Sequence, residues 1–466
     1  MSALALGVVA DDVTGACDLA GVVTAAGMPA TVLLGPPSPV DVPAAGAACV
    51  VVALKTRTAP VTSAVAESVA AGRWLLHHGA RRLYQKYCST FDSTPAGNIG
   101  PVADALAELV GGRSVGTPAT PAVGRTVYQG HLFVDGRLLS ESPLRDHPLT
   151  PMTDADLVRV LGAQTERSVG LAPWPSAGVT PDEPAAHVLL DALTDEDLDR
   201  HAAALAGGDE LLGGASGLAA ALARYWVGVE SARAGAAADS RTGPEHNPPG
   251  EGGSPPYGRA PTLAAASPRP SDELPDVPSD ELPDVPPDEL PDVRPGGGRV
   301  VLAGSCSRRT LEQIAAFPGP VVRIGVDDLA ADPGGTTAAA GDAVLAALAA
   351  SPTGPVLATT ALPPEELRVV QRRHGRERAA TLAEEALSAV ARAVVGAGVR
   401  RLIIAGGETS GAVTGALGVR QVRVGAQVAP GVPWTVSAGP DPLALLLKSG
   451  NFGPADLFTT AWEVGP

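Results

Sequence analysis

Short apolar runs rich in β-branched residues alternate with alanine-rich segments over the first half of the chain. Leu4–Ala10, Ala48–Leu54 and Ala80–Tyr87 have the length and composition of buried strands, and Val61–His78 has the pattern of a helix between two of them. This alternation is typical of βαβ units, in which neighbouring strands run parallel. The pattern therefore predicts an α/β domain with a mainly parallel sheet over residues 1–230.

The last third of the chain repeats this pattern. A predicted helix, Glu377–Gly396, leads directly into one of four predicted strands. These strands are Arg299–Gly304, Val321–Ile324, Val356–Thr360 and Arg400–Ala405. We therefore expect a second α/β domain over residues 299–466, and an α/β fold class with two domains of mainly parallel sheet.

The segment between the two domains, residues 231–298, has a different composition. Proline, glycine, alanine and acidic residues dominate it, and an eight-residue unit occurs three times in succession, at Ser271–Pro278, Ser279–Pro286 and Pro287–Arg294. Two prolines in each unit disfavour both a helix and a sheet ladder. We predict a disordered linker here, in preference to a docking motif for a partner.

Composition and charge narrow the class of protein. The 466 residues are 45% apolar but only 3% aromatic, so the core must be built from Ala, Val, Leu and Ile. The net charge of −16 argues against nucleic acid as a partner. No apolar run reaches the roughly 20 residues that span a membrane. Four scattered cysteines favour free thiols, and the N-terminal apolar run lacks the basic flank of a signal peptide. These features predict a soluble cytoplasmic protein.

Two adjacent carboxylates, Asp11 and Asp12, follow the first predicted strand. Thr14 and Gly15 come next and open a helix that we expect to start near Ala16. Ligands of open α/β sheets bind beyond the carboxyl ends of strands, which is where this motif lies. A helix cap accounts for one carboxylate and leaves the other to orient or deprotonate a substrate hydroxyl.

Residues 85–102 concentrate short polar side chains after the third predicted strand. They include Lys86, Asp92, four Ser and Thr hydroxyls, two amide side chains and two glycines. The chain has only three lysines among its 34 basic residues, so Lys86 indicates a place where a compact ammonium group is needed. The segment favours a site for a small polyhydroxylated anion. The alternative is a strand followed by a Ser/Thr-rich turn that caps a helix.

The second domain contains three turns of small residues, at Gly304–Ser307, Gly406–Gly411 and Lys448–Gly453. A strand that enters a glycine-rich turn and then a helix presents backbone N–H groups to an anion. Neither a Walker A loop nor the GxGxxG pattern is present. Three such turns in one α/β domain predict a nucleotide held along adjacent strand ends, with ordinary turn chemistry as the alternative for the glycines.

A hairpin is predicted at Asp135-Gly136, with Leu132–Val134 and Leu138–Leu139 on its two sides. Polar residues that could bind a carboxylate lie around it in the sequence: Arg125, Gln129, His131, Arg145 and His147. Neither histidine belongs to a metal-ligand spacing, and a lone histidine is more often structural.

Taken together, these motifs resemble those of the four-carbon acid sugar kinases. The segments that carry the resemblance are residues 10–16, 86–94, 97–102, 128–134 and 147–154 in the first domain, and 304–307, 406–411 and 448–453 in the second. They cover nearly the whole chain outside the linker. Residues 86–102 and 128–154 look most like the branch of the family that phosphorylates 3-oxo-tetronates.

This resemblance implies transfer of a phosphoryl group from ATP, with Mg²⁺, to the 4-hydroxyl of a four-carbon sugar acid. It implies that the sugar acid binds the first domain and ATP the second. Asp12 and Lys86 would be catalytic, with Asp11, Arg57, Asp92 and Arg145 on the sugar-acid side. The ATP contacts would be Ser305, Ser307, Gly407, Glu408, Thr409, Ser410 and Gly450, and no protein metal ligand is assigned.

Two features of the chain depart from the family pattern and bear on fine specificity. Leu211–Leu218 carries an extra small residue, and Ala429 stands where a more polar residue is expected. A D-threonate or D-erythronate kinase therefore stays an alternative, because one carbonyl changes few contacts. A non-catalytic sensor of nucleotide and sugar acid is the alternative from another class, and a homo-oligomer is left open. The missing GxGxxG fingerprint counts against a dinucleotide oxidoreductase.

Overall fold

The computed structural model describes residues 4–146, 150–179, 184–239, 293, 298–351 and 353–465. Most of the predicted linker, residues 240–292, lies outside the described residues, and so does His147. The two α/β domains belong to one compact unit.

The first domain has a parallel sheet, as its strand–helix alternation predicts. Its strands follow the order β2-β3-β1-β4-β11-β5-β10-β9. They are β1 Leu6–Ala10, β2 Ala30–Leu34, β3 Cys49–Ala53, β4 Arg82–Lys86, β5 Ser114–Thr117, β9 Val169–Ala172, β10 His187–Leu190 and β11 Leu211–Gly214. The helices are α1 Val13–Ala25, α2 Val61–His77, α3 Ile99–Ala107, α4 Leu157–Gly162, α5 Asp195–Leu205 and α6 Ser216–Asp239.

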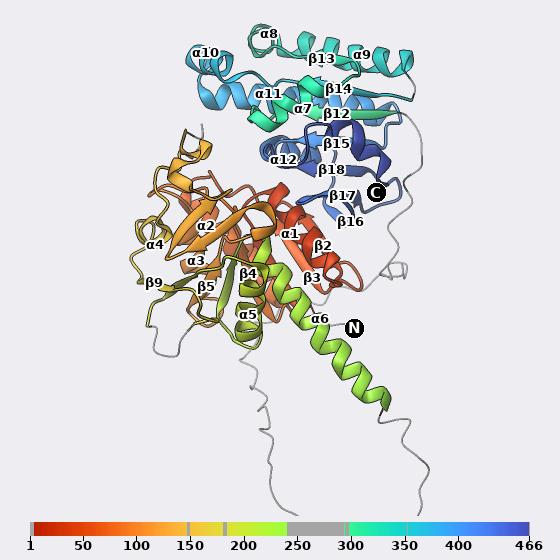
Figure 1. The fold of residues 1–466 in the computed structure, drawn as a ribbon. Coiled ribbons are helices and arrows are strands. Elements are labelled where there is room, and N and C mark those ends of the chain that lie inside the picture. The colour runs from red at the N-terminus through yellow and green to blue at the C-terminus, as the bar shows by residue number, and fades with distance from the viewer. Residues whose placement is uncertain are drawn as a thin grey trace, which may run out of the picture. The chain divides into compact units, whose positions relative to one another are not determined.

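The second domain combines a parallel sheet with an antiparallel edge, in the order β13-β14-β12-β15-β18-β17-β16. Its strands are β12 Arg299–Ala303, β13 Val321–Arg323, β14 Pro355–Thr359, β15 Arg401–Ala405, β16 Gln421–Ala429, β17 Val432–Ser437 and β18 Ala444–Lys448. Its helices are α7 Arg308–Ala316, α8 Val326–Ala331, α9 Pro333–Ala350, α10 Pro364–His374, α11 Arg376–Gly396, α12 Gly407–Ala416 and α13 Leu457–Thr460. Figure 1 shows α11 and α12 beside the strands β12, β15 and β18.

The predicted α/β fold class is confirmed, and the structure adds a join between the two sheets. Strand β16 pairs antiparallel with β2, with Val422 opposite Val32, so the eight strands and the seven strands named above form one continuous sheet of 15. The sequence pattern does not reveal this pairing, because the two strands lie almost 400 residues apart.

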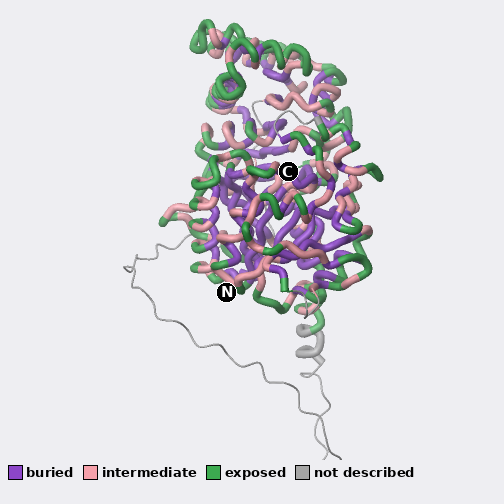
Figure 2. The backbone as a smooth tube through the Cα atoms, turned by 90° about the vertical axis from the view of Figure 1, so that its left-hand side faces the viewer, coloured by how far each residue is buried: buried purple, intermediate pink, exposed green. Residues whose placement is uncertain are grey.

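Buried apolar residues line both faces of the parallel strands. All five residues of β1, β3 and β18 are buried, which is typical of parallel strands covered by helices on both sides. Figure 2 shows this purple interior, with exposed residues along the outer helices and turns. None of the helices within the described ranges is both long and apolar enough to cross a bilayer.

The strand order determines where the turns that carry the predicted site residues lie in each sheet. β1 lies between β3 and β4, and β12 lies between β14 and β15. In each domain the chain passes to both sides of a central strand, and ligands of open α/β sheets bind at such switch points, beyond the carboxyl ends of the strands. Asp11 and Asp12 follow β1, Lys86 ends β4, and the turns after β12, β15 and β18 hold the small residues singled out above.

Two local predictions, a hairpin and the start of a helix, can be compared directly with the structure. The hairpin at Asp135-Gly136 is confirmed between β7 His131–Val134 and β8 Arg137–Leu138, next to β6 Arg125–Tyr128. Helix α1 begins at Val13, three residues before the expected start near Ala16. The difference arises because Asp12 itself caps the helix, so the next residue is already helical.

Candidate functional site

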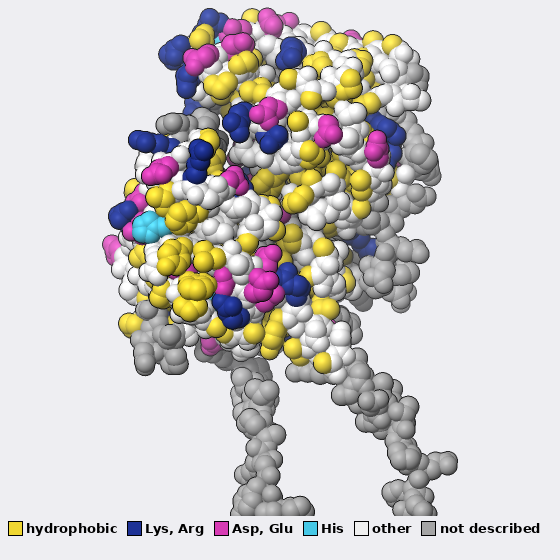
Figure 3. Space-filling model, in the orientation of Figure 1, with side chains coloured by type: hydrophobic (Ala, Val, Ile, Leu, Met, Phe, Trp, Pro, Cys, Tyr) yellow, Lys and Arg dark blue, Asp and Glu magenta, His cyan; other side chains and the backbone are white. Residues whose placement is uncertain are grey.

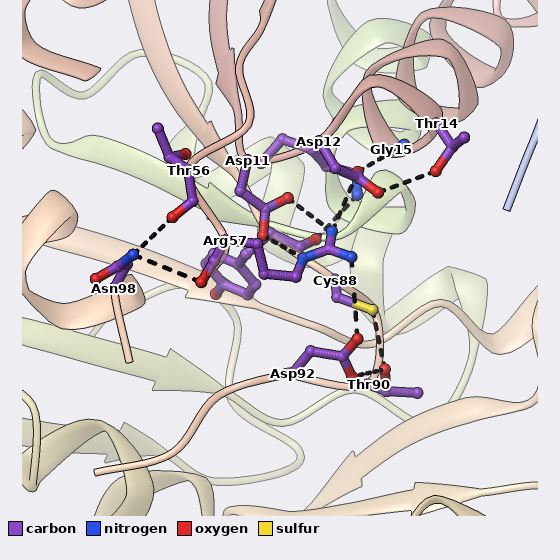
Figure 4. A network of polar contacts seen from close by, with 12 residues as sticks. Asp11, Asp12, Thr14, Gly15, Thr56, Arg57, Cys88, Thr90, Asp92 and Asn98 are labelled. Carbon is purple, nitrogen blue, oxygen red and sulfur yellow. Dashed lines mark hydrogen bonds and ion pairs between the residues drawn. The ribbon is translucent and has the colours of Figure 1, made fainter. Parts of the chain in front are cut away.

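Arg57 is the centre of a polar cluster at the carboxyl ends of β1, β3 and β4 (Figure 4). Its Nε and Nη2 each donate to the Asp11 carboxylate at 2.8 Å. Nη2 also lies 3.1 Å from Asp12 Oδ1, and Nη1 lies 3.9 Å from Asp92 Oδ2. Four of the residues predicted from the sequence are therefore brought together, and one guanidinium group connects the three carboxylates.

Asp12 has two structural partners besides Arg57. Its Oδ1 accepts from the Gly15 N–H at 2.8 Å, which caps α1, and its Oδ2 accepts from the Thr14 hydroxyl at 2.9 Å. Thr14 was not predicted as a site residue, although it stands inside the motif. Burial acts to raise the pKa of Asp12, but the charges of Arg57 and Lys86 and these two hydrogen bonds outweigh it, and the pKa lies below its usual value.

Asp11 shows the opposite balance. Burial raises the pKa of Asp11 by more than the charge and hydrogen bonds of Arg57 lower it. Of the two adjacent carboxylates, Asp12 is therefore the one held most firmly in the ionised form. An ionised Asp12 can accept a hydrogen bond from a hydroxyl group at any physiological pH.

Lys86 is buried at the end of β4, with an exposed fraction of only 3%. Its Nζ donates to the Tyr87 carbonyl at 2.9 Å. A Cβ on Gly15 would come within 3.0 Å of the same nitrogen, so glycine at this position leaves room for the ammonium group. The lysine charge acts on Asp11, Asp12 and also Asp18, a residue of α1 that sequence reasoning missed.

The loops that carry these groups are fixed by side-chain hydrogen bonds to the backbone. The Asn98 amide donates to the carbonyls of Thr56, at 2.6 Å, and Ala59, at 2.8 Å, which holds the segment that bears Arg57. A bond between two side chains adds to this, because the Thr90 hydroxyl donates to Asp92 Oδ1 at 2.6 Å. Asn98 stands in one of the segments that carry the resemblance noted from the sequence, and only its side-chain bonds to backbone carbonyls reveal its role.

The cluster encloses little space of its own. Asp11, Arg57, Lys86, Asp92 and Asn98 line a cavity of about 20 Å³, which is room for one water molecule. The side chains of Asp11 and Arg57 nevertheless keep exposed fractions of 17% and 21%. A larger ligand would therefore contact the open side of the cluster.

Arg145 lies elsewhere. It stands in a short 3₁₀ turn, Pro143–Asp146, and is exposed, with its backbone N–H donating to Ser142. No hydrogen bond or ion pair found among the described residues joins it to the Arg57 cluster. Near the same hairpin, Arg125 pairs with Asp135 at 3.8 Å and His131 Nδ1 lies 2.8 Å from the Gln129 carbonyl. The assignment of Arg145 to the substrate stays a prediction.

In the second domain the three predicted turns pack against one another. A Cβ on Gly450 would lie 2.3 Å from Ser305 Oγ, and one on Gly304 would lie 2.3 Å from Thr409 Oγ1. Gly406 adopts a φ of 126° and sits against Ser305 and Thr409, a backbone conformation that favours glycine. Glycines at these positions let the backbones approach closely enough to form a single small-residue surface.

Helix α12 begins at this surface. The first N–H groups of a helix have no partner within it and carry partial positive charge, and those of α12 belong to Gly407, Glu408 and Thr409. The Ser410 hydroxyl is buried without a hydrogen-bond partner. The Glu408 side chain is half exposed and lies 3.7 Å from Lys55 Nζ. The turn can therefore accept an anion through backbone amides.

The two clusters meet at one point. A Cβ on Gly407 would lie 3.2 Å from Asp12 Oδ2 and 3.6 Å from Thr14 Oγ1. The ionised oxygen of the first cluster thus faces the start of α12. This is an arrangement in which a hydroxyl group held by a carboxylate can approach an anion held by helix amides.

Charge on the surface is mixed, and the described residues do not form a metal centre. On the face shown in Figure 3, basic and acidic side chains are interspersed, so this face lacks the continuous basic stripe typical of nucleic-acid binding. In the parts of the chain that the structure describes, no group of three or more His, Cys, Asp and Glu side chains is placed to hold a metal ion.

Comparison with known proteins finds a family match for two parts of the chain. Residues 6–222 match a family described as a sugar-binding N-terminal domain, and residues 300–458 match one described as a nucleotide-binding C-terminal domain. A protein of Pseudomonas fluorescens named 3-oxo-tetronate kinase is 43% identical, over 98% of this chain and 96% of its own length. A protein of Salmonella typhimurium with the same name is 36% identical, over 98% of each chain.

Solved structures agree with the fold over the full length. One from Salmonella typhimurium LT2 superposes with a TM-score of 0.75 at 32% identity, covering 98% of both chains. One from Haemophilus influenzae has a TM-score of 0.67 at 31% identity and covers 98% of this chain and 99% of its own.

Proposed function

The chain belongs to the family that joins a sugar-binding N-terminal domain to a nucleotide-binding C-terminal domain, and from this premise we propose that it is an ATP-dependent kinase. The acceptor is the 4-hydroxyl of a four-carbon sugar acid, and the substrate we propose is a 3-oxo-tetronate. Full-length relatives at 36–43% identity that carry the name 3-oxo-tetronate kinase support this choice. We expect the reaction to take place in the cytoplasm, where ATP is available.

The observation that carries the proposal is the approach of Asp12 to the start of α12. The 3.2 Å between Asp12 Oδ2 and a Cβ built on Gly407 brings a hydroxyl acceptor next to a row of helix amides. Phosphoryl transfer needs little covalent chemistry from the protein and depends on positioning and charge neutralisation. An acceptor for the hydroxyl and a cradle for the phosphates are the two parts required.

We assign Asp12 the role of holding the 4-hydroxyl. Because the pKa of Asp12 lies below its usual value, it is ionised in the working range and accepts the hydroxyl hydrogen bond. A carboxylate of low pKa is a weak base, so its contribution is mainly to orient the hydroxyl before the proton leaves. This suits a loose transition state, in which the attacking oxygen carries little charge early in the reaction.

Lys86 and Arg57 supply the positive charge in this site. Arg57 is already engaged by Asp11 and Asp12, so we assign it to fixing these carboxylates and, with Asp92, the open side of the cluster. An ammonium group has three donors, and Lys86 uses one of them on the Tyr87 carbonyl. We therefore propose that Lys86 is the cation that interacts with the anionic substrate.

We place ATP on the surface formed by the three small-residue turns. The amides of Gly407, Glu408 and Thr409 and the unpartnered Ser410 hydroxyl would bind phosphate oxygens, with Ser305, Ser307 and Gly450 beside them. Mg²⁺ would accompany the nucleotide as part of MgATP. When bound, the metal would neutralise phosphate charge.

The experiment that tests the proposal is ADP release with MgATP and a panel of 3-oxo-tetronates, D-threonate and D-erythronate. Turnover on a 3-oxo-tetronate, with the phosphate on O4 by NMR, is the expected result. Turnover confined to threonate or erythronate would move the substrate to the reduced acids. Binding of both ATP and a sugar acid by calorimetry, without turnover of any acid, would favour a sensor.

A further inference from the structure

Lys448 is a buried lysine that the assignments above leave without a role. It is the last residue of β18, with an exposed fraction of 0%. Its Nζ donates to Thr310 Oγ1 at 3.2 Å and to the Gly450 carbonyl at 3.2 Å. The ring centroid of Phe458 lies 5.8 Å from the same nitrogen. The amine therefore points into the interior beneath the nucleotide turns.

The Gly450 carbonyl is the common target of the side chains around Lys448. Besides the amine, it accepts from Ser307 Oγ at 2.6 Å and from Thr310 Oγ1 at 2.9 Å. Ser307 and Thr310 belong to the turn after β12 and the first turn of α7, so these bonds attach that turn to the one after β18. These three donors restrain the orientation of the Gly450 peptide.

The backbone of Lys448 makes the connection to the third turn. Its carbonyl accepts from the Gly406 N–H at 2.9 Å, directly before α12 begins. Lys448 thus holds Gly406 through its backbone and Gly450 through its amine. Ser305 packs between them, 3.3 Å from a Cβ on Gly406 and, through its Oγ, 2.3 Å from one on Gly450. The hydrogen bonds of Lys448 and the packing of Ser305 thus connect all three small-residue turns.

Folding stability does not account for a lysine at this position. Burial, assisted by the charge of Arg309 on α7, lowers the pKa of Lys448 to about 7. No carboxylate among the described residues pairs with it. A buried amine without a counter-ion costs free energy, whereas an apolar side chain of the same length would fill the space without this cost.

We propose that Lys448 is a positioning residue of the nucleotide site, which sets the Gly450 and Gly406 turns at the spacing that ATP phosphates require. This rests on the proposed function only in identifying the ligand as ATP. A neutral amine has two N–H donors, which match its two acceptors, Thr310 Oγ1 and the Gly450 carbonyl. Thr310 is then a second positioning residue, because its hydroxyl accepts from the Lys448 amine and donates to the Gly450 carbonyl.

The test compares Lys448→Met, Thr310→Val and Thr310→Ser with the unaltered full-length protein. The first two remove a donor to Gly450 and the third keeps the hydroxyl. We expect Lys448→Met and Thr310→Val to raise KM for ATP, and Kd for ATP by calorimetry, at least tenfold. KM for the sugar acid should stay within twofold, Tm of Lys448→Met should not fall, and Thr310→Ser should stay near the parent values.

Thr435→Val is the matched structural control. Thr435 is fully buried on the neighbouring strand β17 and donates to the Leu445 carbonyl at 2.7 Å, away from the turns. We expect it to lower Tm without changing KM for ATP. If Lys448→Met fails to fold, the contrast between Thr310→Val and Thr310→Ser decides.

Values of Kd for ATP within twofold of the parent for both Lys448→Met and Thr310→Val would overturn the inference, whatever happens to Tm. If the parent binds ATP but shows no turnover, the proposed kinase function fails. The twofold limit on Kd for ATP then still tests the role of Lys448. Should the parent bind no ATP, both proposals are wrong.

Discussion

Replacing Asp12 by asparagine separates the two roles that this residue has in the structure. The amide oxygen of asparagine can still accept the Gly15 N–H that caps α1, and asparagine is as good a helix cap as aspartate. The change removes the negative charge that faces the start of α12 and the ion pair with Arg57 Nη2. We therefore expect a large effect on catalysis and a small one on folding.

The magnitudes follow from these contacts. Loss of an ionised group that orients the attacking hydroxyl is expected to reduce kcat by about 10²–10⁴, which corresponds to roughly 3–5 kcal/mol in the barrier. Arg57 keeps its two 2.8 Å hydrogen bonds to Asp11, so the loss of stability should be about 1 kcal/mol or less. In a domain of this size that lowers Tm by about 2–4 °C.

The assay is steady-state ADP release with saturating sugar acid, together with ATP binding by calorimetry and Tm by scanning calorimetry. Asp197→Asn is the matched control, because Asp197 likewise accepts backbone N–H groups at the start of a helix, α5, and pairs with an arginine, Arg200. The control should lose stability and keep kcat. Asp12→Asn with kcat within threefold of the parent, in a folded protein that binds ATP, would refute the role of Asp12 in orienting the substrate.

Three further predictions concern the nucleotide turns, pH and the linker. Gly450→Ala places a Cβ 2.3 Å from Ser305 Oγ, so it should raise KM for ATP at least tenfold and leave KM for the sugar acid unchanged; equal changes in both would contradict the placement of ATP. Because the pKa of Lys448 is lowered to about 7 from 10.5, the unfolded chain binds a proton between these values that the folded chain does not. Lys448 should therefore make stability rise with pH across this window, by up to about 1.4 kcal/mol per pH unit, and Lys448→Met should remove that share of the slope in urea unfolding at pH 7–10; identical slopes would show that the amine stays charged. Replacing the repeats Ser271–Arg294 by a glycine-serine segment of equal length should leave kcat within twofold, and a folded variant that has lost turnover would assign the repeats a part in catalysis.

How far the sequence predicts the site depends on how local each contact is. Asp11, Asp12 and Lys86 could be placed because each stands at the end of an apolar run, and strand ends of a parallel sheet share one edge. The geometry then assigned Arg57 to holding carboxylates, a role that its position in the sequence does not reveal. The meeting of Asp12 and Gly407 joins segments almost 400 residues apart, which no local pattern encodes.

Turns and strand pairings show the same difference between local contacts, which the sequence predicts, and distant ones, which it does not. The hairpin at Asp135-Gly136 was predictable because its turn residues dictate its geometry. The pairing of β16 with β2 was not, because it joins strands almost 400 residues apart that no local pattern links. Ser307 was expected to contact ATP and Thr310 was not singled out, and only their shared acceptor, the Gly450 carbonyl, shows that both join two of the turns.

Each domain has a lysine at the end of a parallel strand, and the charged groups around the two lysines differ. Two of the three lysines end parallel strands: Lys86 is paired in register with Ala10, and Lys448 with Ala405. Each donates to a backbone carbonyl of the turn that follows it. Carboxylates surround the first, whereas the second has none to pair with among the described residues. A lysine beside the carboxylates of the first cluster can serve an anionic substrate there, and a lysine without carboxylate partners is better suited to hold a turn by hydrogen bonds. The surroundings of each strand end, rather than the residue type, therefore decide whether its lysine serves the substrate or the backbone.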